Sequence, residues 1–374
     1  MRILLALCLV AACGGDKSGN SGDDAPGDAA GSDDAGTDDA PTDAEITITC
    51  GGETCRADQS CIADTCTFAC SGQNVPGDYA TVQAAVTALG ATQGAVICLR
   101  GESYTAPANL GGAGLTIIGV SASKTSLTGV PSIFTTGNVT LKGLTVDGAL
   151  NLHGRGATTT ITGVRVTGGI QIQRERTGSA VAGHKAILDG VDVTGGVHLF
   201  DANCNNCDGK VELEVINSYL HDADDCLRYD ESGNRTQYVI HAINNTLVGC
   251  MRGIYAPTVI DPAGSPIHTI ELRNNIVANH SIVGITHESA GSMNSQTVFT
   301  TANNALFGNT NNYADGALDG PGYVKQDCLL SGTPPVLGAG SPCLGAGSAT
   351  NAPDHDFWGH PRSTPLDIGA TESP

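Results

Sequence analysis

Apolar and polar residues alternate in short blocks that recur along the chain between about Leu115 and Phe307. Written one block per repeat, the sequence reads LTIIGVSASK, VTLKGLTVDG, TTITGVRVTG, AILDGVDVTG, LEVINSYLHD, IHAINNTLVG, IELRNNIVAN and FTTANNALFG. The period of two within each block predicts β-strands rather than helices. The blocks recur roughly every 26 residues, and a unit of that length cannot bury its own apolar side. The repeats are therefore expected to stack into one long core.

Three positions in each block keep a fixed chemical character. The fifth holds glycine in the first four blocks and asparagine in the last four, namely Gly119, Gly143, Gly163, Gly190, Asn217, Asn244, Asn274 and Asn303. Three residues later come apolar residues expected to face the core, namely Val146, Val166, Val193, Leu220, Leu247, Val277 and Leu306. Two residues beyond those stand types that tolerate a positive φ, namely Gly148, Gly168, Gly195, Asp222, Gly249, Asn279 and Gly308. Short strands with such corners predict an all-β fold, a right-handed parallel β-helix.

The corner asparagines resemble those of the pectin-lyase-like β-helix superfamily, and the resemblance covers roughly residues 77–372. The tail, with its words SPCLGAG, DHDFWGHPR and DIGATE, also resembles the closing segment of secreted bacterial β-helix proteins. Trp358 and His360 depart from the usual pattern of that segment. The resemblance implies a capped β-helix, but no single activity, because this scaffold hosts lyases, hydrolases and adhesins.

The first residues of the chain predict export. Residues 1–12 (MRILLALCLVAA) read as a secretory signal peptide, and the ending Val10-Ala11-Ala12-Cys13 resembles a bacterial lipobox, which would make Cys13 the lipidated N-terminus. The alternative is a plain signal peptide cleaved nearby. No other stretch approaches the roughly 18 apolar residues of a membrane span, so the lipid would be the only membrane anchor. The protein is expected on the bacterial cell envelope, at the outer membrane or the cell surface.

Charge separates a tether from the folded part. Residues 13–45 contain ten acidic residues and one lysine without any periodic apolar set, which predicts a disordered tether. The whole chain has a formal net charge of −20, and an acidic body argues against nucleic acid or anionic membrane as a partner. The same charge gives no long-range attraction for an anionic polysaccharide. The protein is expected to be a monomer.

Cysteine usage agrees with an exported protein, because the twelve cysteines after Cys13 are an even number suited to disulfides. Five of them lie within residues 46–71 and predict a small disulfide-knit module, with a zinc site as the alternative. Neighbouring turns of the solenoid would bring Cys226 next to Cys250. The other predicted pairs are Cys328 with Cys343, Cys204 with Cys207 and Cys70 with Cys98.

The β-helix domain is expected over residues 72–374, with an N-terminal cap (72–114), coils (115–312) and a C-terminal cap (313–374). In the first cap, the apolar spacing of Asp78–Leu89 predicts a helix, with Thr81 or Asp78 as its N-cap.

The tail reads as a closing strap in which Arg362 pairs with an acid. Asp354 and Asp356 of this strap could hold Ca²⁺, with a structural salt bridge as the alternative.

A second set of short strands follows the blocks, and their outward positions form two columns. The third positions are Asn151, Gln171, His198, Arg228, Tyr255 and Thr286. The fifth positions are His153, Gln173, Phe200, Asp230, Pro257 and Glu288. Such a row of polar and aromatic side chains is typical of a sugar-binding groove, with Gln171, His198, Tyr255 and Glu288 as the candidate substrate-binding residues. The alternative is an ordinary solvated face.

Two enzymatic chemistries remain open on that face. Asp224 and Asp225, followed by Cys226, resemble part of the paired-acid motif of the polygalacturonase branch, but Met251-Arg252-Gly253 replaces the expected histidine word and the Asn-Thr-Asp word is missing. Asp222, next to this pair, also reads as a turn residue. Asp230 and Glu288 form another carboxylate pair, near the upper limit of the spacing that an inverting hydrolase uses.

A lyase would use a cation and a base instead. Asp201, Asp230 and Glu231 could hold Ca²⁺, with Arg228 as the base and His198 as the alternative base.

The sequence therefore favours recognition of a polysaccharide along the polar face. The enzymatic alternative is a pectin-lyase-like lyase or glycosidase that uses the same face. A third alternative is a structural or adhesive surface solenoid without sugar chemistry.

Overall fold

The computed structural model describes residues 48–174, 183–200, 209–229, 236–257, 267–287, 297–315, 317 and 319–373. The predicted signal peptide, the lipidation site Cys13 and the whole of the predicted tether lie outside these residues. So do the candidate residues Asp201, Cys204, Cys207, Asp230, Glu231 and Glu288. Within the described part the secondary structure is almost entirely β, and no helix there is long and apolar enough to cross a membrane.

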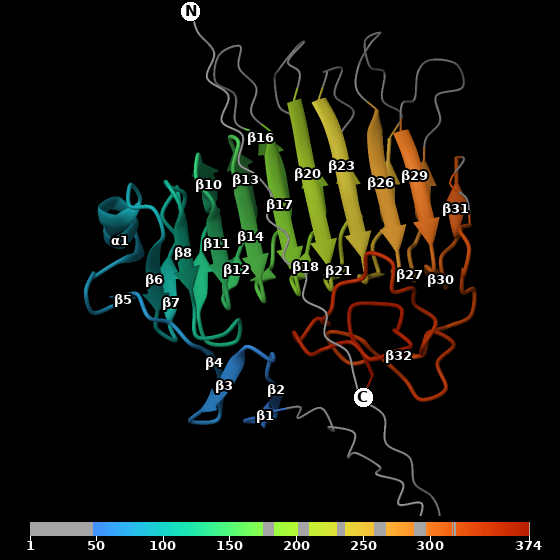
Figure 1. The fold of residues 1–374 in the computed structure, drawn as a ribbon, viewed down its shortest axis with the longest axis horizontal. Coiled ribbons are helices and arrows are strands. Elements are labelled where there is room, and N and C mark those ends of the chain that lie inside the picture. The colour runs from blue at the N-terminus through green and yellow to red at the C-terminus, as the bar shows by residue number, and fades with distance from the viewer. Residues whose placement is uncertain are drawn as a thin grey trace, which may run out of the picture. The chain divides into compact units, whose positions relative to one another are not determined.

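Three parallel sheets form the three sides of a solenoid (Figure 1). The eight-stranded sheet contains β10 (Ser132–Thr135), β13 (Leu150–Gly154), β16 (Ile170–Arg174), β19 (Val197–Leu199), β22 (Asp225–Tyr229), β25 (Arg252–Ala256), β28 (Val283–His287) and β31 (Tyr313–Ala314). The ten-stranded sheet contains β5 (Gln73–Val75), β6 (Ala95–Leu99), β8 (Leu115–Ile118), β11 (Val139–Lys142), β14 (Thr158–Thr162), β17 (His184–Asp189), β20 (Gly209–Ile216), β23 (Thr236–Ile243), β26 (His268–Arg273) and β29 (Thr297–Ala302). The nine-stranded sheet contains β7 (Ser103–Thr105), β9 (Ser126–Thr128), β12 (Thr145–Asp147), β15 (Arg165–Val166), β18 (Asp192–Thr194), β21 (Tyr219–His221), β24 (Thr246–Val248), β27 (Ile276–Ala278) and β30 (Ala305–Phe307). The predicted all-β parallel solenoid is confirmed.

The core runs through the stack, as the alternation predicts. The seven apolar residues expected to face inward, from Val146 to Leu306, are all fully buried. Along β20 the side chains alternate between buried and partly exposed, which matches the period of two. Since burying one Val or Leu side chain contributes roughly 1.5–3 kcal/mol, this continuous row is the main stabilising term of the solenoid.

The corner between the ten-stranded and nine-stranded sheets has the backbone that its residue types predict. Asn217, Asn244, Asn274 and Asn303 all have φ between 52° and 55°, a left-handed conformation that asparagine adopts more readily than most residues. At the next turn, Asp222 has a φ of 52°, which supports its interpretation as a turn residue.

A second row of asparagines lies inside this corner, and the sequence analysis did not identify it. The row consists of Asn245, Asn275 and Asn304, each directly after a corner asparagine. Oδ1 of Asn275 accepts hydrogen bonds from N and Nδ2 of Asn245, both at 3.0 Å, and Nδ2 of Asn275 donates to the carbonyl of Ala242. The row satisfies the polar groups that the turn buries, which would otherwise be costly.

The C-terminal strap lies against the asparagine half of the corner. Nδ2 of Asn274 donates to the carbonyl of Ser348 and its Oδ1 accepts from the N–H of Ser348, both at 2.8 Å. Arg362 pairs with Glu372 at 2.8 Å and donates to Oδ1 of Asn217. The side chains of this ion pair are 1% and 3% exposed. The predicted strap, with Arg362 paired to an acid, is present, and the disulfide Cys328–Cys343 joins its first residues to the preceding segment.

The cysteine-rich module packs against the glycine half of the same corner. It consists of β1 (Thr49–Cys50), β2 (Glu53–Thr54), β3 (Gln59–Ile62) and β4 (Thr65–Phe68). A separate short hairpin, which pairs β32 (Leu330–Ser331) with β33 (Val336–Leu337), lies near the strap and is not part of the module. Disulfides join Cys50 to Cys61, Cys55 to Cys66 and Cys70 to Cys98. In place of the competing zinc site, the structure therefore has disulfides.

Glycine at these corners makes room for the module. A Cβ atom at Gly143 would overlap the ring of Phe68, and one at Gly190 would overlap the guanidinium of Arg56. The change from glycine to asparagine along the repeat thus separates the docking site of the module from that of the strap.

The N-terminal end of the solenoid carries α1 (Val82–Leu89), as predicted. The hydroxyl of Thr81 accepts a hydrogen bond from the N–H of Ala84 at 3.1 Å and caps the helix. Val82, Ala85 and Val86 pack into the core. The segment predicted as a cap also supplies β5, β6 and β7, which already pair with the sheets of the solenoid.

We expect Arg362→Ala to lower the free energy of unfolding by about 3–5 kcal/mol, because it leaves the buried Glu372 carboxylate without its cation. Lys325→Ala, which removes a mostly exposed partner of Asp319, serves as the control and should cost less than about 1 kcal/mol. Urea-induced unfolding measures both changes. Equal losses in the two variants would show that the strap does not depend on the buried pair.

His355 links the strap to the solenoid in a pH-dependent way. Hydrogen bonding to Asp189, together with a smaller contribution from Asp354, raises the pKa of His355 to about 9 against the opposing effect of burial. Because the folded pKa lies above the unfolded value, this contribution is fully present below about pH 6.5 and is lost as the pH rises through about 9. We expect the melting temperature to fall less between pH 7 and pH 10 in His355→Gln than in the unmodified chain. Identical pH profiles would contradict this assignment.

Candidate functional site

The predicted outward column lies in register on the eight-stranded sheet. Asn151 pairs with Gln171, then follow His198, Arg228, Tyr255 and Thr286, each directly opposite the residue of the preceding strand. The first five side chains are at least partly exposed, whereas Thr286 is buried. The structure therefore brings Gln171, His198 and Tyr255, the described members of the candidate binding set, into one row.

Aromatic rings accompany the row at its early strands. The ring of His153 stacks on Phe134 with centroids 4.2 Å apart, and His198 lies 5.3 Å from Phe200. Gln173, opposite His153 on the next strand, hydrogen-bonds to the imidazole. Burial lowers the pKa of His153, so this ring is neutral at pH 7. The early part of the face thus presents flat rings and amide groups.

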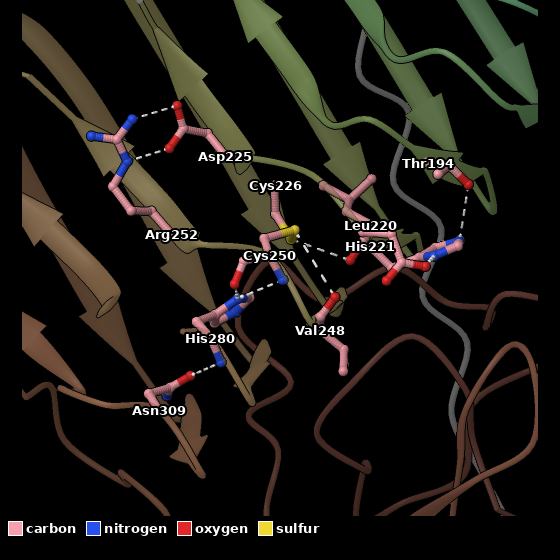
Figure 2. Close-up of a disulfide and its surroundings, with 11 residues drawn as sticks. Thr194, Leu220, His221, Asp225, Cys226, Val248, Cys250, Arg252, His280 and Asn309 are labelled. Atoms are coloured by element: carbon pink, nitrogen blue, oxygen red, sulfur yellow. Dashed lines mark hydrogen bonds and ion pairs between the residues drawn. A yellow bond between two sulfur atoms is a disulfide. The ribbon is translucent and has the colours of Figure 1, made fainter. Parts of the chain in front are cut away.

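The later part of the row is organised around one buried carboxylate, Asp225. Its two oxygens accept hydrogen bonds from Nε and Nη2 of Arg252, and Nη1 of Arg228 reaches Oδ2 at 3.2 Å. Figure 2 shows the two-point contact between Arg252 and Asp225. The guanidinium of Arg252 also lies 3.7 Å from the ring centroid of Tyr255, a cation–π contact. The carboxylate thereby fixes two half-exposed guanidinium groups beside an aromatic ring.

This geometry gives Asp225 the role of a counterion. A side chain that is 2% exposed, with both oxygens engaged by arginines, is poorly placed to donate or accept a proton on a ligand. Asp224 is exposed to solvent, so the two adjacent aspartates of the hydrolase interpretation occupy different environments. Arg228, proposed as a lyase base, is held in an ion pair with Asp225.

Sequence reasoning did not identify Arg252, although it belongs to this cluster. It stands in the word Met251-Arg252-Gly253, which attracted attention only because a histidine was missing there. The signal that would have identified it is the register, since Asp225 and Arg252 face each other on adjacent strands.

A disulfide ties together the turns beneath this cluster. Cys226 and Cys250 are joined as predicted, with Cα atoms 5.8 Å apart, and the N–H of Cys250 donates to Nδ1 of His280 at 3.1 Å (Figure 2). Burial lowers the pKa of His280 to about 4, so the ring stays neutral and acts as an acceptor for the backbone. The cross-link therefore holds the strands that carry Asp225 and Arg252 at a fixed spacing.

His221 forms a separate polar group on the nine-stranded sheet. Its imidazole contacts Asp192 at 2.8 Å and Asp222 at 2.7 Å, and these hydrogen bonds raise its pKa although burial opposes them. The group thus lies on a different side of the solenoid from the polar row.

The calcium set predicted for the lyase interpretation, Asp201, Asp230 and Glu231, lies outside the described residues, as does Glu288 of the binding set. The chain matches no protein-family model and no curated protein.

We expect Asp225→Asn to lower the free energy of unfolding by about 1.5–3 kcal/mol, because it weakens hydrogen bonds to charged groups and leaves two guanidinium groups facing each other. Asp224→Asn is the matched control, and at this exposed position the change should stay within about 0.5 kcal/mol. Urea unfolding of both variants tests the assignment. A silent Asp225→Asn would mean that the carboxylate does not organise the cluster.

Proposed function

We propose that this protein recognises a polysaccharide along the row formed by Gln171, His198, Arg228 and Tyr255. The observation that carries the proposal is the in-register row itself, in which planar donors and an aromatic ring stand on consecutive strands. Strands in a sheet lie about 4.8 Å apart, so the row from Asn151 to Tyr255 is about 19 Å long. A linear ligand with regularly spaced hydroxyl groups matches such a row better than a single small molecule does.

Preorganisation supports the same proposal. Arg228 and Arg252 share one buried carboxylate, and Tyr255 is covered by a guanidinium, so these groups lose little freedom when a ligand binds. Aromatic and planar polar side chains are suited to the alternating apolar and hydroxyl faces of sugar rings. We further propose the cell envelope as the location, with Cys13 as the lipid anchor, and kinship with the pectin-lyase-like superfamily. The proposed location and the proposed kinship rest on the sequence alone.

Recognition is favoured over hydrolysis because Asp225 is engaged by two arginines. A calcium-dependent lyase is the enzymatic alternative, with Arg228 near the substrate and Asp201, Asp230 and Glu231 on the cation. The structural or adhesive solenoid is the third candidate.

The test is binding and turnover by the full chain on polygalacturonate, alginate and a panel of neutral glycans, with Ca²⁺ or with EDTA. We expect saturable binding of at least one polymer, weakened tenfold or more in Tyr255→Ala and in Arg228→Ala, without release of products. Lys210→Ala, on the ten-stranded sheet, is the control and should bind like the unmodified chain.

Other outcomes identify the alternatives. Unsaturated products that require Ca²⁺ and disappear in Arg228→Ala would establish the lyase. New reducing ends without unsaturation would establish a glycosidase. Neither binding nor products on any polymer would reject polysaccharide recognition and favour the structural solenoid.

A further inference from the structure

A cavity of about 430 Å³ lies where the cysteine-rich module, the glycine corner and the C-terminal strap meet. Its walls include Arg56, Phe68, Arg165, Asp192, Phe357 and Trp358. Among the described residues, none of those that line it belongs to the eight-stranded sheet, so it is separate from the polar row. The volume falls within the range of about 300–1,000 Å³ that is typical of small-molecule sites.

The walls of this cavity are held in place without a ligand. Two disulfides fix the module, and the N–H of Ala57 donates to the carbonyl of Trp358 at 2.8 Å. Arg56 also donates through Nη1 to the carbonyl of Phe357. Contacts from the module thus reach the strap directly, and a ligand would enter a largely preformed site, which reduces the entropy lost on binding.

Two guanidinium groups line the cavity with donors to spare. The Arg56 side chain is 8% exposed, its Nε lies 3.5 Å from Asp58, and its Nη2 forms no hydrogen bond within the described part of the chain. Arg165 uses only Nε, on Asp192 at 2.7 Å, and both its terminal nitrogens lack a hydrogen-bond partner among the described residues. Such terminal N–H groups suit the two oxygens of a carboxylate.

The acids on the wall are already engaged. Asp192 accepts hydrogen bonds from Arg165 and from His221, and these partners lower its pKa against the effect of burial. Glu53 accepts a hydrogen bond from the hydroxyl of Ser123 at 3.1 Å. Both arginines, by contrast, keep terminal N–H groups available to a ligand, and such donors favour an anion.

The apolar part of the wall is aromatic. Phe357 and Trp358 pack edge to face with centroids 4.8 Å apart, and Phe68 belongs to the same lining. Aromatic faces favour flat rings, whether aryl groups or the apolar face of a sugar. Trp358 is one of the two residues at which the closing segment departs from its usual pattern, so the aromatic wall is a feature of this chain.

We propose that this cavity binds a small organic acid in which a carboxylate is attached to a six-membered ring. The carboxylate is held by the terminal nitrogens of Arg56 and Arg165, and the ring lies against Trp358. A sugar acid and an aromatic acid share this chemistry, and the test below distinguishes them. The proposal does not depend on the polysaccharide row, because it uses other residues on another side of the solenoid.

Trp358 is the only tryptophan of the chain and reports on its own cavity. With the full chain, titration with glucuronate is expected to change the tryptophan emission in a saturable way, while glucose leaves it unchanged. Benzoate and its neutral counterpart benzyl alcohol are compared by calorimetry, because aromatic ligands absorb the exciting light. Tighter binding of glucuronate would identify a sugar acid as the ligand, and tighter binding of benzoate would identify an aromatic acid.

Arg165→Gln is expected to weaken that binding tenfold or more, because it removes the terminal nitrogens that hold the carboxylate. The side chain is half-exposed, so the substitution should not disturb the fold. Arg155→Gln, outside the cavity, is the matched control and should bind normally, and melting curves confirm that both variants fold. The proposal is overturned if no carboxylate binds, if a neutral counterpart binds equally well, or if Arg165→Gln binds like the control.

Discussion

The buried hydrogen bonds of the corner are the constraint on which the rest of the solenoid depends. Each turn leaves backbone groups facing a dry interior, and Asn245, Asn275 and Asn304 pair with those groups and with one another from turn to turn. A slip of one residue in the pairing of any strand would break this row. It would also move the apolar side chains of that strand out of the core. On the turns that carry this row, the same register places Arg228, Tyr255 and Thr286 opposite one another on the eight-stranded sheet.

The residue type at the outer corner then decides what covers the solenoid. Asparagine at 217, 244, 274 and 303 offers side-chain donors and acceptors, which the strap uses, while glycine at 143, 163 and 190 lets the module approach the backbone. One repeated position thus carries two different docking surfaces. The cavity lies near their boundary, where Arg56 of the module meets Phe357 of the strap.

Much of the fold was predictable, because strand alternation and corner residues are local patterns that repeat. The outward row, the helix cap at Thr81, the Cys226–Cys250 pair and the strap ion pair of Arg362 all followed from spacing or from a recognised segment. The features that were not predicted depend on contacts between residues that the spacing along the sequence does not encode. Arg252 became visible only through its register with Asp225, and the burial of Asp225 could not be read from its neighbours. The contact of Arg56 with Phe357 joins residues 301 positions apart.

The covalent link between Cys70 and Cys98 has a mechanical consequence. A pull on the chain ahead of Ile48 reaches β6 through this disulfide, while the hydrogen bond between Ala57 and Trp358 passes part of the load to the strap. The strap in turn holds several later turns at their corners through Asn217, Asn274 and Asn303. Tension is thereby shared among many turns at once, so the solenoid resists being unwound one turn at a time from its first strand.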